Sequence, residues 1–324
     1  MAQDTLEPLQ FHPILKSRIW GGEKLHTLLH KKTSDQNIGE SWEISDVHGD
    51  VSSVAHGSFQ GWTLSDLVSR FKGEFIGQKN FHRFGAKFPL LIKFIDAKAD
   101  LSIQLHPNDK LAKERHNSFG KNEMWYIMQA DADAKIIVDF NQKIDVNLYE
   151  YHLKNGTLPS VMNCEQVTPG DAFMIDVGRV HAIGAGVVLA EIQQTSDVTY
   201  RLYDWDRVDD QGNPRELHTD MALEAIDFNL PNNFRRDYKK TPNHPNPIVE
   251  CPYFNCNYLE INNKTLISNI YDSFLIYICI EGDLTVNFNQ NKWELKQGET
   301  ILIPAAVTSF EIDTEFAKLL EVYV

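Results

Sequence analysis

The sequence predicts an all-β fold with helical additions, divided into two β-barrel domains. From Phe88 onward, short apolar, β-branched and aromatic runs alternate with Asp, Gly and Asn, a pattern typical of antiparallel strands. The chain has 324 residues, more than one hydrophobic core usually organises. A stretch rich in proline, residues 241–252, separates two strand-rich regions. We therefore expect two domains, each with a core of its own.

The domain boundaries follow from that stretch. Residues 241–252 read TPNHPNPIVECP and show no periodicity, so they are expected to form an extended linker. Residues 1–240 then form the first domain with its helical decorations. Residues 253–324 form a smaller C-terminal domain of short strands.

The individual elements can be assigned in chain order. A helix is expected at residues 63–71, because Thr63 and Asp66 form a capping pattern at its start. Helical periodicity also favours residues 109–116 and 146–154. Strands in the first domain are expected at 88–95, 101–105, 124–128 and 134–138. The helices would decorate the barrel and contribute little to its core.

Two segments of the first domain recur in the second. Residues 170–175, GDAFMI, correspond to 298–303, GETILI, and residues 125–128, WYIM, resemble 276–279, IYIC. Apolar strands after a Gly-acidic turn are common in all-β proteins, so the match could also arise by chance. In this alignment Glu123 corresponds to Phe274 and His181 to Ser309. The second domain would then have lost the polar chemistry of the first.

Composition limits the partners. The formal net charge of -14, without any Lys/Arg-rich run, disfavours nucleic acid. A small anionic substrate would need a local cluster of Lys and Arg inside a pocket. No segment approaches the roughly 18–20 apolar residues of a membrane span, and the first nine residues lack the features of a signal peptide. The four cysteines form no C-x-x-C pair. We expect a cytoplasmic protein with reduced thiols and no membrane partner.

Candidate metal ligands lie on predicted strands. Side chains alternate along a strand, so Gln104 and His106 share one face of 101–107. By the same rule Lys121 and Glu123 share a face, and His181 follows a Gly turn at a strand entry. Two imidazoles, a carboxylate and an amide oxygen can form an open catalytic zinc site. Manganese, cobalt or iron would accept the same ligands, and amide oxygen is an uncommon zinc ligand. A lone His on a strand is more often a packed or surface residue.

Residues 191–207 are dense in polar and aromatic side chains. Most such runs are exposed loops with surface ion pairs. A functional interpretation gives an arginine for a phosphate or developing oxyanion, and carboxylates for proton transfer.

Several segments together resemble the type I phosphomannose isomerases, over about the first two thirds of the chain. They are residues 13–22, PILKSRIWGG; 39–43, GESWE; 101–107, LSIQLHP; 121–126, KNEMWY; 178–182, GRVHA; and 197–201, DVTYR. The resemblance implies a cupin-type (jelly-roll) fold in both domains, with the metal site in the first. It implies zinc, one ion per chain, bound by Gln104, His106, Glu123 and His181. It further implies Arg201 as the catalytic arginine, and pocket roles for Lys121, Asp197 and Glu191.

The resemblance implies a zinc-dependent isomerase that interconverts D-mannose 6-phosphate and D-fructose 6-phosphate through an enediolate. Lys121, next to a dication, could serve as base or hydroxyl donor, while Arg201 would hold the enediolate or the phosphate. Two other hypotheses are another metal-dependent cupin sugar-phosphate isomerase, acting for instance on glucose 6-phosphate, and a non-catalytic sugar-binding cupin. The protein is expected to be a monomer or homodimer.

Overall fold

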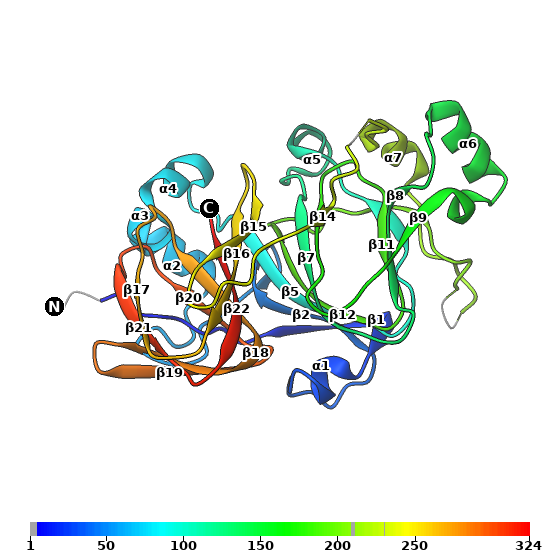
Figure 1. Ribbon diagram of the computed structural model, residues 1–324. Coiled ribbons are helices and arrows are strands. Elements are labelled where there is room, and N and C mark those ends of the chain that lie inside the picture. Colours follow the sequence, from blue (N-terminus) through cyan, green and yellow to red (C-terminus); the bar gives the residue numbers. More distant parts are fainter. Residues whose placement is uncertain (1–4, 209–210, 230) are drawn as a thin grey trace.

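The chain folds into two strand-rich parts that lie side by side (Figure 1). The structure, a computed structural model, describes residues 5–208, 211–229 and 231–324. Every pairing between its named strands is antiparallel, as the alternating apolar runs predicted. No helix among these residues is long and apolar enough to cross a membrane.

The first part consists of two sheets. A seven-stranded sheet has the order β1-β2-β5-β12-β7-β10-β14, and a five-stranded sheet has the order β13-β6-β11-β8-β9. The bounds of the larger sheet are β1 (Ile14–Gly22), β2 (Ile38–Ile44), β5 (Leu90–Ala97), β7 (Glu123–Ala130), β10 (Ala172–Ile175), β12 (Val187–Gln194) and β14 (Arg235–Arg236). Those of the smaller are β6 (Ile103–Leu105), β8 (Lys135–Phe140), β9 (Met162–Gln166), β11 (His181–Ile183) and β13 (Tyr200–Tyr203). A short hairpin pairs β3 (Asp46–Val47) with β4 (Asp50–Val51).

The C-terminal part is built around one long strand. In its eight-stranded sheet, β18 (Leu275–Phe288) pairs with β19 (Asn291–Lys296), β20 (Thr300–Ile303), β21 (Ser309–Asp313) and β22 (Ala317–Tyr323). The other strands are β15 (Asn246–Glu250), β16 (Asn255–Ile261) and β17 (Thr265–Ser268). Strand β15 pairs with β16, so part of the expected 241–252 linker is an edge strand of this sheet. Edge pairing tolerates Pro247, whose missing N–H costs no central ladder bond.

Three helices form where the sequence predicted them. They are α2 (Leu64–Phe71), with the Thr63/Asp66 capping box, α5 (Asp109–His116) and α6 (Val146–Lys154). Short helices that the sequence analysis missed are α1 (Lys24–Thr27), α3 (Gly73–Ile76), α4 (Gln78–Phe84), α7 (Thr219–Ala225) and the 3₁₀ turn η1 (Leu158–Val161). Helix α4 lies beside the C-terminal part, where Asp272 accepts hydrogen bonds from its first two backbone amides. A partner distant in the sequence therefore supports the start of this helix.

The hydrophobic core is partly separate and partly shared. One cluster, with Trp125 and Phe173, belongs to the first part, and another, with Tyr277 and Phe310, belongs to the C-terminal part. A third cluster joins both: the rings of Phe88 and Phe274 lie 4.6 Å apart between centroids. Each part thus has a hydrophobic cluster of its own, and a third cluster connects the two parts.

Strand register shows how the two barrels correspond. Ile175 pairs with Glu123, and Ile303, its counterpart, pairs with Leu275. The matching turns agree, since Gly170 N–H donates to Ile127 and Gly298 N–H donates to Cys279. Glu123 thus corresponds to Leu275, and the sequence alignment to Phe274 was wrong by one residue. An alignment of short apolar runs cannot fix a register that hydrogen bonds decide.

Candidate metal centre and its cavity

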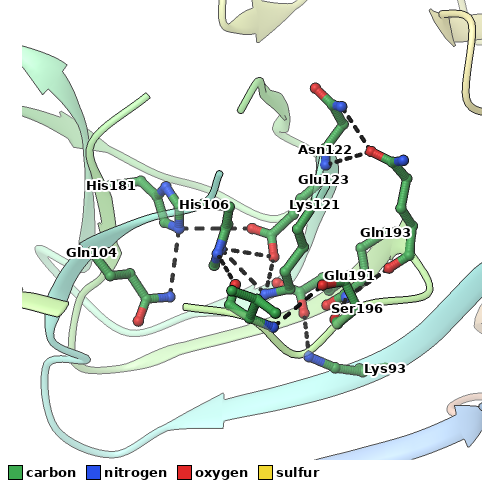
Figure 2. A network of polar contacts seen from close by, with 12 residues as sticks. Lys93, Gln104, His106, Lys121, Asn122, Glu123, His181, Glu191, Gln193 and Ser196 are labelled. Atoms are coloured by element: carbon green, nitrogen blue, oxygen red, sulfur yellow. Dashed lines mark hydrogen bonds and ion pairs between the residues drawn. The ribbon is translucent and has the colours of Figure 1, made fainter. Parts of the chain in front are cut away.

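Three buried side chains converge at the ends of strands that belong to the two sheets of the first part. Glu123 is the first residue of β7 and His181 the first of β11, while His106 directly follows β6. Their exposed fractions are 0–1 %. One possible ligand atom from each lies within 4.8 Å of the others, and Figure 2 shows the three side chains facing one another. The structure therefore brings together three of the four predicted ligands as a group that could hold a metal ion.

The hydrogen bonds of the two imidazoles determine which ring nitrogen faces the group. Nδ1 of His106 lies 2.9 Å from the Val198 carbonyl, and Nδ1 of His181 lies 2.9 Å from the Arg179 carbonyl. A carbonyl oxygen only accepts, so each Nδ1 must donate and each neutral ring has a lone pair at Nε2. This arrangement orients histidine ligands in metal sites.

The Nε2 atoms approach the Glu123 carboxylate, at 3.3 Å for His106 and 3.8 Å for His181. Two lone pairs and a carboxylate repel one another unless positive charge lies beside them. The Lys121 ammonium supplies part of that charge, and a metal ion among the three groups would supply more. Neither Glu123 oxygen has a hydrogen bond within the described residues; Oε1 is paired with the Lys121 ammonium, while Oε2 has only the contact with the neutral His181 ring. The residues present fit a bound metal cation, and imidazole with carboxylate is a donor set that zinc accepts.

Electrostatics keep these ligands in the forms that a metal requires. Burial, together with the neighbouring His106, lowers the pKa of His181 to about 3, and burial and Lys121 lower the pKa of His106. Burial alone would raise the pKa of Glu123, but the Lys121 ammonium and His106 outweigh it and hold that pKa well below its usual range. The imidazoles are therefore neutral and the carboxylate ionised near pH 7.

Gln104 and Lys121 border the group. The side-chain nitrogen of Gln104 lies 3.5 Å from His181 Nε2, while its oxygen accepts from Ser102. Ligation through the oxygen would require the amide to turn over. Lys121 Nζ lies 2.6 Å from Glu123 Oε1 and 3.2 Å from His106 Nε2. Its ammonium thus supplies positive charge beside the candidate ligands.

A cavity of about 360 Å³ opens beside the His106, Glu123 and His181 side chains, which we call the metal group. Six of the eight predicted site residues line it, and the other two, His106 and Glu123, are buried behind it. The predicted residues on its wall are Gln104, Lys121, His181, Glu191, Asp197 and Arg201. The described wall also includes Arg18, Lys93 and Arg215, so it carries five Lys and Arg side chains against three carboxylates. This is the local basic cluster that an anionic substrate would need in a protein of net charge -14.

Arg201 and Asp197 occupy different positions on the wall. Arg201 Nη1 donates to the Glu216 carbonyl, while its buried Nε has no hydrogen bond to any residue that the structure describes. Burial and the nearby Arg215 lower the pKa of Arg201. A buried, unpaired guanidinium N–H suits an anionic oxygen. Asp197 is exposed and lies between this cavity and a second one of about 860 Å³ beside α5.

Glu191 lies in the middle of β12 as part of a buried polar network. Its Oε2 pairs with Lys93 Nζ at 3.0 Å, and its Oε1 accepts from the indole N–H of Trp125 at 3.0 Å. Burial and the Glu123 charge raise the pKa of Glu191. Burial lowers the pKa of Lys93, but the charges of Glu191 and Glu40 raise it by more, so the pKa lies above its usual value.

The sequence analysis assigned no role to Lys93, Trp125, Arg18 or Arg215. Lys93 and Trp125 lie within apolar strands, where isolated polar positions look like ordinary alternation. The sequence does distinguish Lys93, because it is a lysine inside an otherwise apolar run. A lysine in such a run is rarely buried without a partner, so this pattern could have predicted a buried ion pair.

The two jelly-roll parts, with a buried His/Glu/His group beside a polar cavity, define a cupin protein with a candidate metal centre. The family model of the type I phosphomannose isomerase catalytic domain matches residues 9–148, and that of the mannose-6-phosphate isomerase cupin domain matches residues 246–324. The chain is 35% identical over 312 residues to the mannose-6-phosphate isomerase ManA of Bacillus subtilis (strain 168), covering 95% of this chain and 96% of that protein. The chain therefore belongs to the type I phosphomannose isomerases.

Other relatives agree. The mannose-6-phosphate isomerase of Streptococcus mutans is 30% identical over 309 residues, with 95% of each chain covered. The solved mannose 6-phosphate isomerase from Bacillus subtilis superimposes with a TM-score of 0.89 at 30% identity, covering 98% of this chain and 100% of that one. Apo mannose 6-phosphate isomerase from Salmonella typhimurium, at 16% identity and a TM-score of 0.78, shares the fold over 98% of this chain and 99% of that one. The expected family, fold and enzyme class are confirmed.

Proposed function

We propose that this protein interconverts D-mannose 6-phosphate and D-fructose 6-phosphate, with one zinc ion per chain, through an enediolate. The observation that carries the proposal is the convergence of His106, Glu123 and His181 beside a cavity lined by Lys121 and Arg201. The names of relatives that match nearly the whole chain support the same reaction. Gln104 would be the fourth ligand once its amide is turned.

The reaction moves one proton between adjacent carbons. The base removes the proton from C2 of the open-chain aldose, the C–H electron pair forms the C1–C2 double bond, and the carbonyl oxygen gains negative charge. The C2 hydroxyl then loses its proton and O1 gains one, so that the negative charge passes to O2. As the C2–O bond becomes the carbonyl, the C1–C2 electron pair takes a proton at C1, which gives the ketose. A zinc ion in this site would stabilise the charge on the sugar oxygens by several kcal/mol.

The protein side chains divide the remaining work. Glu191 is the proposed acid–base group, because a carboxyl whose pKa is raised by burial works closer to neutral pH. Lys121, whose ammonium is paired with Glu123, donates to a sugar oxygen. Arg201 supplies its unpaired N–H to the enediolate or the phosphate. Asp197, exposed at the cavity edge, positions a sugar hydroxyl.

We also propose that the protein works in the cytoplasm on a small sugar phosphate. All four cysteines are free thiols, as expected in a reducing compartment. The cavity volume suits one small molecule and is too small for a polymer.

The test is turnover of mannose 6-phosphate by the purified protein, before and after chelation and after zinc is restored. The proposal predicts activity that the chelator abolishes and zinc restores. A glucose 6-phosphate panel run in parallel would detect another sugar-phosphate isomerase. If the zinc-loaded protein binds sugar phosphates without converting any, the protein is a binding cupin and the proposed reaction is wrong.

A further inference from the structure

A row of buried residues crosses three strands in the wall of the cavity. Lys93 on β5 is paired in register with Glu191 on β12, and Glu191 is paired in register with Trp125 on β7. Side chains opposite one another in antiparallel strands point to the same face of the sheet. We call Lys93, Glu191 and Trp125 the first-barrel row; each is at most 5 % exposed.

The row fixes both oxygens of one carboxylate. Lys93 holds Glu191 Oε2 and Trp125 holds Oε1, each at 3.0 Å. The indole of Trp125 also contacts the ring of His181 in a T-shaped arrangement, with centroids 5.4 Å apart. One side chain thus contacts both the proposed acid–base group and a candidate metal ligand.

The C-terminal barrel contains the same row at the corresponding register. Asn257 on β16 pairs with Glu321 on β22, and Glu321 pairs with Tyr277 on β18. Asn257 donates to Glu321 Oε1 at 2.9 Å, and the Tyr277 hydroxyl donates to Oε2 at 2.7 Å. We call these three residues the second-barrel row. Both rows clamp a central glutamate between two cross-strand donors.

Within the described residues 231–324, no group of His, Cys, Asp or Glu side chains that could hold a metal ion lies beside the second-barrel row. The pair His181 and Gln104 of the first barrel corresponds to the pair Ser309 and Ser268 of the second. Glu123 corresponds to Leu275. The clamped glutamate therefore belongs to the barrel itself. What distinguishes the first barrel is that its clamp adjoins a metal group and a polar cavity.

We propose that Trp125 is a positioning residue for the isomerisation, whose indole N–H fixes the Glu191 carboxylate for proton transfer. The inference rests on the proposed function of Glu191. Trp125 is a donor only, so it pairs with a Glu191 oxygen in its acceptor form while Lys93 holds the other. Losing the N–H would free the carboxylate to rotate away from the reacting carbon.

The test compares five variants of the full-length zinc-loaded protein. Trp125→Phe keeps an aromatic ring and removes the donor, and it should lower kcat for mannose 6-phosphate by about 10- to 100-fold, with KM and zinc content near wild type. Trp125→Tyr copies the second-barrel donor and should recover much of that loss. Adding Trp125→Phe to the Glu191→Gln variant should lower kcat no further than Glu191→Gln alone, because the two residues act as one unit.

Tyr277→Phe is the matched control. It removes the equivalent donor from the second-barrel row and should leave kcat unchanged while lowering the melting temperature about as much as Trp125→Phe. The inference is overturned if Trp125→Phe retains wild-type kcat, if its effect multiplies with that of Glu191→Gln, or if Trp125→Tyr is no more active than Trp125→Phe. Absence of turnover in zinc-loaded wild-type protein would overturn the proposed function itself, and this inference with it.

Discussion

At the scale of single residues, the site depends on buried polar groups that hold one another. His106 and His181 are oriented by backbone carbonyls, so their free nitrogens meet at Glu123. The cost of burying a carboxylate is offset by Lys121, which gives Glu123 a low pKa. The ligand group is thus ready to accept a cation near neutral pH.

Substitutions at this scale should separate metal binding from catalysis. His181→Ala should lose both metal and turnover. Lys121→Met should retain the metal and lose about 100- to 10,000-fold in kcat, and Arg201→Ala about 100- to 1,000-fold. Metal analysis and steady-state rates of each purified variant check this. An active, metal-free His181→Ala protein would remove His181 from the ligand group.

The low pKa of His181 predicts how the stability of the chelated protein depends on pH. Its pKa is about 3 when folded, against about 6.5 when unfolded, so the unfolded chain binds more protons between these values. The stabilisation is complete above pH 6.5 and is lost as pH falls toward 3. The free energy of unfolding should therefore fall by about 2 kcal/mol between pH 6.5 and pH 5. Urea unfolding at both pH values measures this fall in the free energy of unfolding. In a chelated His181→Gln variant the fall should be clearly smaller.

At the scale of elements, contacts between distant segments decide where short helices form. Helix α2 begins with its own capping box, while α4 depends on Asp272, almost two hundred residues later. Nearby backbone bonds, from Ala305 and Ala306 to α3, fix the same helical segment to the C-terminal part. These helices therefore connect the two barrels.

Removing the Asp272 carboxylate should weaken this connection without touching the site. Asp272→Ala leaves two amides at the start of α4 without acceptors, and the free energy of unfolding should fall by about 1 kcal/mol. Chemical denaturation measures the change, and Glu315→Ala, at another exposed position, is the control. Equal stability of both variants would mean that water replaces the cap.

At the scale of the whole molecule, the C-terminal barrel packs against the back of the seven-stranded sheet. Residues of β5, β7 and β12 that alternate with the cavity wall, such as Ile92, Met124 and Ala190, join the shared cluster with Phe274 and Ile276. The strands that carry Glu123 and Glu191 are thus packed between the cavity and the second barrel. This gives the C-terminal barrel a structural role.

The shared core predicts that the two parts unfold together. Phe274→Ala should destabilise the protein by about 3–5 kcal/mol and preserve a single calorimetric transition. Phe310→Ala, in the cluster of the C-terminal part alone, should also show one transition. Two separate transitions in either variant would show that the parts are independent folding units.

The sequence by itself predicted the all-β class, the three longer helices and a set of candidate metal ligands, because strand alternation and capping are local. The strand positions and the family segments pointed to the same candidate ligands. Only the tertiary structure decided that Trp125 and Lys93 clamp Glu191, that the barrels correspond through Leu275, and that α4 is capped by Asp272. These features depend on hydrogen-bond register and on contacts between distant segments, which a linear pattern does not contain.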